Sequence, residues 1–325
     1  MNRFSTVQAA IALFAAFAFP APAHASDWPS RPVTVIVPFA AGGNTDMMAR
    51  LATQHLSAKF GQSFVVENRP SAGGAVATGQ GATAAPDGYT LLFSAAANIN
   101  LTPQLQKLPY DPVKQLVPVT NVGTGTQTIA VNRRIPVTTL PELIAYAKAN
   151  PGKLNFTAAG TQNVSHLAPV LLFALAGIDL VFVPAKGGPQ AVSDIMSGQV
   201  DVYFGNSSEL LPHINSDKIR LLATGAAQRL AAVPDLPTVA ETIPGFEFSS
   251  WNGFSVPTGT PEPIVKAIRD EVTALVKTPE VSDRLTRLGI MPGGMTKEEV
   301  QAYFIKDRAA LTAAVKAAKI EPPTQ

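Results

Sequence analysis

Glycine-rich loops that each follow an apolar run and open a predicted helix are the segments of this chain best suited to chemistry. Ala40–Thr45 and Ser71–Gly74 are the first two, and Ala159–Gln162 and Lys186–Gly188 repeat the arrangement later. Backbone N–H groups in the first turn of a helix lack an intrahelical acceptor, so they can bind an anion without a charged side chain. The loops therefore predict several neutral sites for a small anion.

Side chains that could catalyse a reaction are scarce by comparison. The chain has no cysteine, which excludes thiol catalysis and iron–sulfur clusters, and we find no spacing typical of a metal site. Ser165 lies beside His166, but adjacent helical residues point in different directions, and no G-x-S-x-G segment is present. We expect no enzyme, no metal and no cofactor. An exported serine hydrolase using Ser165 or Ser94 is the less favoured alternative.

The first 25 residues are typical of an export signal. Arg3 precedes the apolar run Ala9–Phe19, Pro20 ends that run, and Ala23–Ala25 has the small-x-small pattern of a cleavage site. We expect cleavage before Ser26 and a location in the periplasm. The run is shorter than the roughly 20 residues that cross a membrane. Because the chain has no cysteine, we expect no lipid anchor.

Charge excludes one class of partner. The chain has 25 Lys and Arg residues against 23 Asp and Glu residues, with no basic block. A protein that binds nucleic acid usually carries a clustered basic surface. We therefore expect no nucleic-acid partner.

The rest of the chain alternates segments with strand and helix patterns. Val33–Val37 is a continuous apolar run typical of a strand buried on both faces, and Thr45–Leu56 carries an apolar helical stripe. The same alternation recurs from Thr128 onward, and Ile264–Ala317 has the pattern of amphipathic helices. This order predicts an α/β fold in which doubly wound, mostly parallel sheets are flanked by helices.

The length of the chain favours two lobes, because about 300 residues exceed a typical single core. We expect residues 26–123 and 226–325 to form one lobe and residues 124–225 the other, with crossovers near 123–126 and 224–227. The C-terminal helices should pack back on the first lobe. Ligands of such sheets bind outside the carboxyl ends of the strands, where all the glycine loops lie, so the lobes should form a cleft that closes by hinge motion.

The motifs in these loops resemble the periplasmic receptors of tripartite tricarboxylate transporters, the Bug-type binding proteins. The resemblance begins with Pro38–Arg50 and Glu67–Gly74 and covers essentially the whole chain after the signal, in the family's order. The remaining matching segments are Ala85–Leu92, Ser165–Ala168, Lys186–Gly188, Gly198–Asp201, Leu236–Glu241 and Pro257–Pro261.

The resemblance implies a two-lobed "Venus flytrap" that delivers a small carboxylate to the permease subunits of a membrane transporter. It also implies that backbone amides and ordered water hold the carboxylate, which agrees with the neutral loops. We expect a monomer. A co-receptor that presents its ligand to a membrane sensor kinase would share the fold and is the main alternative.

Two departures from the family pattern bear on the ligand. Gly205-Asn206 stands where many relatives carry an acid before the asparagine, and an acid there could meet a ligand's ammonium group. Its absence argues against an amino-acid ligand. The loop Ser94–Asn98 has fewer hydroxyls than the usual version, which favours a less polar acid, aromatic or short and aliphatic.

The expected ligand-binding residues come from these loops on both lobes. Asp46 is expected to be structural, because it would repel an anion, and Lys186 is the one cation beside a glycine loop, where it steers an anion or is simply solvated. Loop capping is the alternative role of Ser94, Asn98 and Ser165. The full set is Phe39, Ala40, Gly42, Gly43, Asn44, Gly73, Gly74, Ser94, Ala96, Asn98, Thr126, Gln127, Gly160, Thr161, Ser165, Lys186, Gly187, Gly205 and Asn206.

Overall fold

The computed structural model describes residues 28–161 and 163–317, and the predicted export signal lies outside them. In the N-terminal third, strands and helices alternate as the sequence predicts. The strands β1 and β2 pair in parallel, as do β1 and β3, because each is separated from the next by a helical crossover. These elements are β1 (Val33–Val37), α1 (Asn44–Phe60), β2 (Phe64–Asn68), α2 (Ala75–Ala82) and β3 (Thr90–Ala95), followed by the short helices α3 (Thr102–Leu105) and α4 (Pro112–Gln115).

One long strand, β4 (Leu116–Asn132), joins the two halves of the molecule, where the sequence predicted only a short strand over Ile129–Val131. Up to Thr126 it pairs antiparallel with β9 (Ser249–Pro257). From Gln127 onward it pairs antiparallel with β7 (Val202–Asn206) and β8 (Ile219–Thr224). With β5 (Asn155–Ala158) and β6 (Val181–Phe182), the strands therefore form one continuous path, β2-β1-β3-β9-β4-β7-β5-β6, with antiparallel pairs at its centre.

The second half repeats the parallel strand and helix pattern. Strand β5 pairs in parallel with both β6 and β7. Helix α6 has the bounds predicted from the sequence, because the Asn163 side chain caps its first turn and Gly177 ends it in the left-handed conformation. The elements are α5 (Leu140–Ala149), β5 (Asn155–Ala158), α6 (Val164–Ala176), β6 (Val181–Phe182), α7 (Gly188–Ser197) and α8 (Ser207–Leu210).

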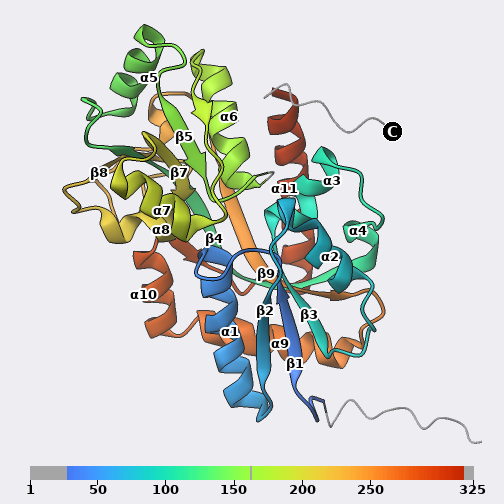
Figure 1. Ribbon diagram of the computed structural model, residues 1–325. Helices are drawn as coiled ribbons and strands as arrows, with labels where there is room; N and C mark the ends of the chain where they lie inside the picture. The colour runs from blue at the N-terminus through green and yellow to red at the C-terminus, as the bar shows by residue number, and fades with distance from the viewer. Residues whose placement is uncertain (1–27, 162, 318–325) are drawn as a thin grey trace, which may run out of the picture.

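The C-terminal helices return to the first half, and the last one also reaches the second. They are α9 (Glu262–Val276), α10 (Pro279–Arg287) and α11 (Lys297–Ala317), with the short strand β10 (Ile290–Pro292) paired to β4. Helix α9 packs against α1 and β4, whereas α11 lies beside α6 as well (Figure 1). Helix α11 thus returns to the first half, as expected, and in addition contacts the second half through α6.

Aromatic contacts mark where the core sits. Phe93 of β3 and Phe254 of β9 are fully buried and meet edge to face, with ring centroids 5.0 Å apart. Trp251 is also fully buried and stacks on Phe304 of α11 at 3.8 Å between centroids. Its indole N–H donates to the Asp307 carboxylate at 3.0 Å. Strand β9 thus packs Phe254 against β3 and Trp251 against α11.

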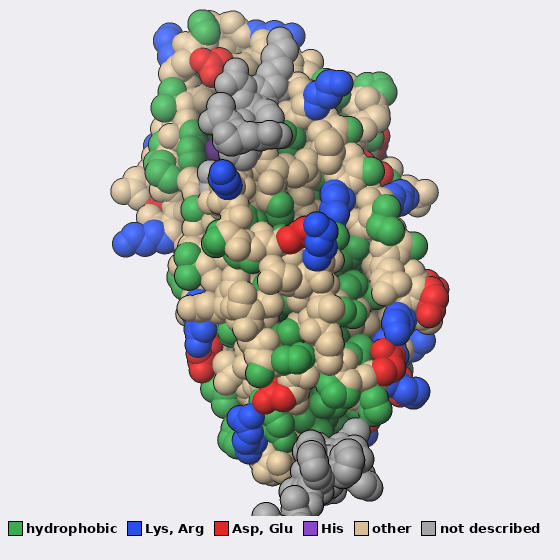
Figure 2. All heavy atoms as spheres, turned by 90° about the vertical axis from the view of Figure 1, so that its right-hand side faces the viewer, with side chains coloured by type: hydrophobic (Ala, Val, Ile, Leu, Met, Phe, Trp, Pro, Cys, Tyr) green, Lys and Arg blue, Asp and Glu red, His purple; other side chains and the backbone are tan. Residues whose placement is uncertain are grey.

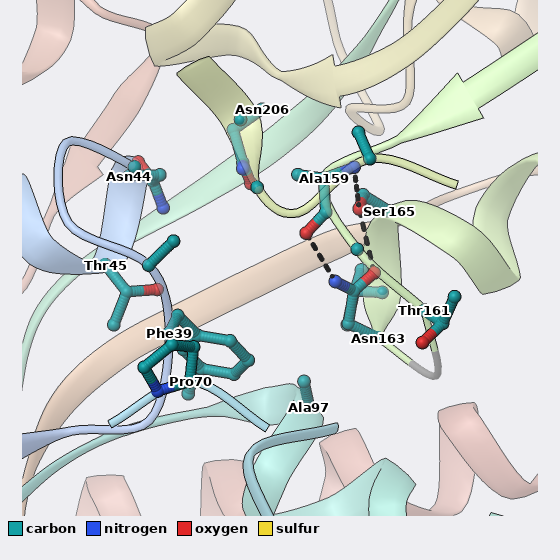
Figure 3. Close-up of a pocket in the computed structure, with 18 of the residues that line it drawn as sticks. Phe39, Asn44, Thr45, Pro70, Ala97, Ala159, Thr161, Asn163, Ser165 and Asn206 are labelled. Atoms are coloured by element: carbon teal, nitrogen blue, oxygen red, sulfur yellow. Dashed lines mark hydrogen bonds between the residues drawn. The ribbon is translucent and has the colours of Figure 1, made fainter. Parts of the chain in front are cut away.

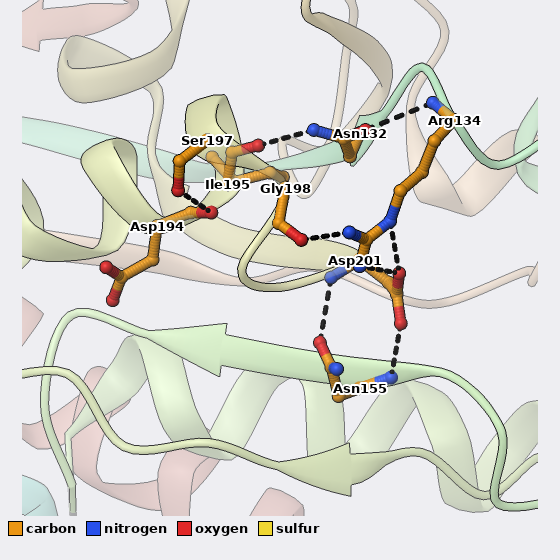
Figure 4. Close-up of polar contacts among 8 residues, drawn as sticks. All are labelled: Asn132, Arg134, Asn155, Asp194, Ile195, Ser197, Gly198 and Asp201. Atoms are coloured by element: carbon orange, nitrogen blue, oxygen red, sulfur yellow. Dashed lines mark hydrogen bonds and ion pairs between the residues drawn. The ribbon is translucent and has the colours of Figure 1, made fainter.

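The Gly198–Asp201 motif has a structural role, because Asp201 links neighbouring segments by hydrogen bonds (Figure 4). Its carboxylate accepts bonds from Arg134 Nη2 at 2.6 Å and Nε at 3.1 Å, and from the Asn155 N–H at 2.9 Å. The Asp201 N–H donates to Asn155 Oδ1 at 2.8 Å. The motif therefore ties the loop after β4 to β5 and β7, away from the strands' carboxyl ends.

Charged side chains are dispersed over the face of the molecule that Figure 2 shows. On the face in Figure 2, Lys and Arg side chains are scattered among Asp and Glu rather than gathered into a patch. Within residues 28–161 and 163–317, no helix is long and apolar enough to span a bilayer. The same described residues hold no cluster of His, Asp and Glu that could bind a metal ion.

Candidate functional site

A cavity of about 630 Å³ lies where the carboxyl ends of the parallel strands in the two halves face each other. This volume lies within the usual range for small-molecule sites. The loops after β1, β2 and β3 line one side, and those after β5, β6 and β7 line the other. Of the predicted residues, the cavity wall contains Phe39, Ala40, Gly43, Asn44, Gly73, Gln127, Gly160, Thr161, Ser165, Lys186, Gly187 and Asn206.

The N-terminus of α1 reaches the cavity, but the chain's own carboxylates use part of it. The Gly42 N–H donates to Asp46 Oδ2 at 2.9 Å, so it is not free to bind an anion, contrary to our expectation. Burial raises the pKa of Asp46, but hydrogen bonds from Arg50, Gly42 and Asn68 outweigh burial and hold that pKa below its ordinary value. Asp46 thus has the structural role that the sequence predicted.

Glu209 is the second carboxylate at this helix start, and it belongs to the other half of the molecule. Its Oε1 accepts from the Asn44 N–H at 3.3 Å and from Asn206 Nδ2 at 3.0 Å. Its Oε2 accepts from the Tyr203 hydroxyl at 2.5 Å and from the Asn206 N–H at 3.3 Å. Burial is the largest influence and raises the pKa of Glu209 despite these donors.

This glutamate overturns the expectation of a cleft without an acid. Gly205 lacks a carboxylate, as the sequence shows, but Glu209 lines the cavity four residues later. The pair Asn206 and Glu209 is a capping box, with the asparagine at N-cap and the glutamate at N3 of α8. That signal was readable in the sequence. The contact between Glu209 and α1 could not be read from the sequence, because it depends on how the two halves pack together.

The loop before α6 forms the opposite wall and is braced internally (Figure 3). Ser165 Oγ donates to Asn163 Oδ1 at 2.8 Å and accepts from the Ala159 N–H at 3.1 Å. Asn163 Nδ2 donates to the Ala159 carbonyl at 2.9 Å. The Ser165 hydroxyl proton is therefore committed to the loop, which matches the capping alternative. Neighbouring His166 stacks on Phe182, with ring centroids 4.4 Å apart, so the two do not form a nucleophile and base.

The start of α7 brings the halves into contact at the edge of the cavity. A Cβ atom at Gly187 would lie 2.9 Å from Ala40 Cβ of the first half, and one at Gly188 would clash with the Glu209 carboxylate of the same half. Only glycine permits such a close approach. The Lys186 side chain is exposed beside them and lines the cavity. Ser208 Oγ, 2.7 Å from Asn44 Oδ1, adds a further contact between the halves.

Three predicted side-chain donors lie in the interior instead of the cavity wall. Ser94 is fully buried, and its hydroxyl bonds to the Gly253 carbonyl and to Ser255 Oγ. Asn98 caps the Ala95 N–H at 2.7 Å through Oδ1. Thr126 donates to the Phe248 carbonyl at 2.8 Å. Each polar group is satisfied within the fold, because burial without a partner would be costly.

Three further predicted residues are also absent from the cavity wall. The Gly74 N–H donates to the Ser71 carbonyl at 2.9 Å, and a Cβ there would lie 2.7 Å from Pro38 Cβ. Ala96 is fully buried between two residues that do line the cavity. Gly205 faces the Tyr203 ring, where a Cβ would approach to 2.4 Å.

Several lining residues were not predicted. Thr45 follows Asn44 in the first turn of α1, and its hydroxyl donates to Asn252 Oδ1 at 2.8 Å. Gln127, which was predicted, donates from Nε2 to Asn206 Oδ1 at 3.1 Å, so the point where β4 changes partners is tied to the cavity. The other unpredicted wall residues are Pro38, Pro70, Ser71, Ala72, Ala95, Ala97, Ala159, Asn163, Val164, Pro184, Ala185, Gly188, Gln190, Glu209 and Ser250.

Comparisons with known proteins agree on one family. The model of the tripartite tricarboxylate transporter family receptor matches residues 48–319 of this chain. Protein BugT of Bordetella pertussis is 34% identical over 303 residues, which cover 91% of this chain and 92% of BugT.

Two solved structures that are similar to this chain contain a bound ligand. Rpa4515 of R. palustris, solved with adipate, is 33% identical, covers 91% of this chain and 100% of its own, and has a TM-score of 0.87. MatC from Rhodopseudomonas palustris, solved with bound malate, is 31% identical, covers 89% of this chain and 100% of its own, and has a TM-score of 0.82.

Proposed function

The chain belongs to the tripartite tricarboxylate transporter receptor family, whose members are periplasmic solute-binding proteins, and from this premise we propose that it captures a small carboxylate between its two halves. We propose further that it delivers this ligand to the membrane permease of a tripartite transporter. Residues 26–123 with 226–325, and residues 124–225, are the two lobes of this proposal.

The observation that carries the proposal is a cavity bordered by helix starts from both halves. Helix α1 contributes from one side, and α6 and α7 contribute from the other. The N–H groups of Val164 and Gly188, in the first turns of α6 and α7, find no acceptor among the described residues. Such groups, with the helix dipole behind them, favour a carboxylate oxygen.

The neighbours support the ligand class. Adipate and malate, the ligands named for Rpa4515 and MatC, are both small carboxylates. The wall around the present cavity mixes apolar residues such as Phe39, Pro70 and Ala97 with polar side chains such as Asn44 and Asn206 (Figure 3). A site of this kind sets affinity through a few donors, ordered water and shape.

Thermal unfolding against a panel of acids tests the binding step. The panel should span di- and tricarboxylates, short branched acids, aromatic acids and amino acids, with the corresponding neutral amides as controls. A ligand at about 100 times its Kd stabilises the protein by roughly 2.7 kcal/mol, which raises the unfolding midpoint visibly. We expect a selective rise with one class of acid. Folded, ligand-free protein that responds to no acid would overturn the proposal.

Uptake by cells that lack this receptor tests the delivery step. Loss of uptake of the bound acid, restored by the intact gene, is the expected result. Unchanged uptake together with a lost transcriptional response to that acid would instead identify a co-receptor of a sensor kinase.

A further inference from the structure

We propose that Glu209 makes this receptor select acids that also carry a positively charged nitrogen, such as amino acids, over dicarboxylates of the same length. The inference rests on the proposed function, since it concerns the same cavity. It assigns the carboxylate end and the cationic end of the ligand to different walls.

Glu209 is a carboxylate surrounded by neutral donors. The Asn44 N–H, the Asn206 N–H and side chain, and the Tyr203 hydroxyl make all its hydrogen bonds within the described chain. No Lys, Arg or His of the described residues lies within 4.0 Å of it. A partly buried carboxylate without a cation is costly to keep ionised, so a ligand that brings a cation gains from meeting it.

Asp46, at the same helix start, shows the contrasting arrangement. Its carboxylate is 4% exposed and pairs with Arg50 Nε at 3.0 Å, and it does not line the cavity. Asp46 is thus a structural acid whose charge is already balanced. Glu209 differs on both counts, because it lines the cavity and has no cationic partner. The difference between these two acids separates a ligand-facing role from a structural one.

The remaining wall of the cavity suits the anionic end of a ligand. Thr161 and Ser165 lie across the cavity from Asn44, whose N–H contacts Glu209 (Figure 3). The start of α7 lies against Glu209, so it is the start of α6, beside Thr161 and Ser165, that adds positive potential on the wall across from Glu209. A ligand carboxylate placed there points the other end of the molecule toward α1. A second carboxylate at that end would face Glu209 and be repelled, whereas an ammonium group would be attracted.

Matched ligands measure this preference directly. 4-Aminobutyrate, butyrate and succinate share a four-carbon skeleton and end in an ammonium, a methyl and a carboxylate group. Leucine with 4-methylpentanoate, and phenylalanine with 3-phenylpropanoate, are control pairs, because their ammonium group lies beside the carboxylate and cannot reach Glu209 from the opposite wall. By titration calorimetry, we expect 4-aminobutyrate to bind at least about tenfold more tightly than butyrate, succinate to bind most weakly of this set, and the control pairs to show a smaller preference.

The variant Glu209→Gln keeps the size of the side chain and removes its charge. We expect it to lose the preference for the amino acid by about tenfold or more and to bind the dicarboxylate more tightly than the unmodified protein does. Asp46→Asn is the matched control, because it removes the balanced charge at the same helix and should leave the ratio of affinities unchanged.

The outcomes separate this inference from the proposed function. If the deaminated acid or the dicarboxylate binds as tightly as the amino acid in the unmodified protein, the inference is wrong while the carboxylate receptor stands. An unchanged ratio in Glu209→Gln also refutes it. The comparison of ligands needs no variant, so it decides the matter even if Glu209→Gln folds poorly. If no carboxylate in the set or the wider panel binds, the proposed function itself fails.

Discussion

The substitution Gly187→Ala, which adds one methyl group, tests whether the two halves must meet at the edge of the cavity when ligand is bound. Gly187 has an extended backbone, with φ of 167°, so alanine is not strained there. Its Cβ would lie 2.9 Å from Ala40 Cβ, on the opposite loop. Because carbon atoms pack at about 3.5–4.0 Å, the loops would have to separate by roughly 0.6–1.1 Å.

The cost of this separation sets the expected loss of affinity. Overpacking costs about 1–3 kcal/mol, and each 1.4 kcal/mol changes Kd tenfold, so Gly187→Ala should weaken ligand binding about 5- to 150-fold. We expect the unfolding midpoint of the ligand-free protein to stay unchanged, because the loops can separate when no ligand holds them together. Calorimetric titration and thermal unfolding of the same samples measure both quantities.

Gly125→Ala is the control for this prediction. Gly125 lies in β4, and a Cβ there would contact Ile290 Cγ1 at an ordinary 3.7 Å. Normal ligand affinity in Gly187→Ala would refute the reasoning, because closure would then not require contact with Ala40. An equal loss of stability with and without ligand would also refute it, since the contact would then be permanent.

Three further predictions concern the framework of the site. Asp201→Asn should lower the free energy of unfolding by about 1–3 kcal/mol in urea denaturation, because the Arg134 guanidinium loses its carboxylate partner. Phe254→Ala should lower it by about 3–5 kcal/mol by leaving a cavity against Phe93, and a loss below 1 kcal/mol would contradict the observed packing. Asp46 has a lowered pKa in the folded protein, so its stabilising effect is present above the unfolded pKa of about 3.9 and is lost as the pH falls through the lower, folded value. The stability difference between the natural protein and Asp46→Asn, measured from pH 7 to pH 3, should therefore shrink toward acid and not toward neutral pH.

The order of elements was predictable because local patterns specify it. The apolar run Val33–Val37 became β1, and the capped segment before Gly177 became α6 with its predicted bounds. Strand β4 was the main miss. Its 17 residues include two glycines and several polar side chains, and pairing with β9, β7 and β8 holds them extended. The residues that pair with β4 lie more than 70 positions away from their partners in the sequence, so no local pattern could reveal them.

For the site, the sequence alone determined which loops border the cavity and that backbone groups at helix starts are available there, since both follow from strand and glycine patterns. It could not determine which groups the fold uses itself. Ser94 and Asn98 turned inward to satisfy buried neighbours, and Gly42 gave its N–H to Asp46. Glu209 reaches α1 only because the two halves pack together, so the charge of the cavity was decided by tertiary contacts.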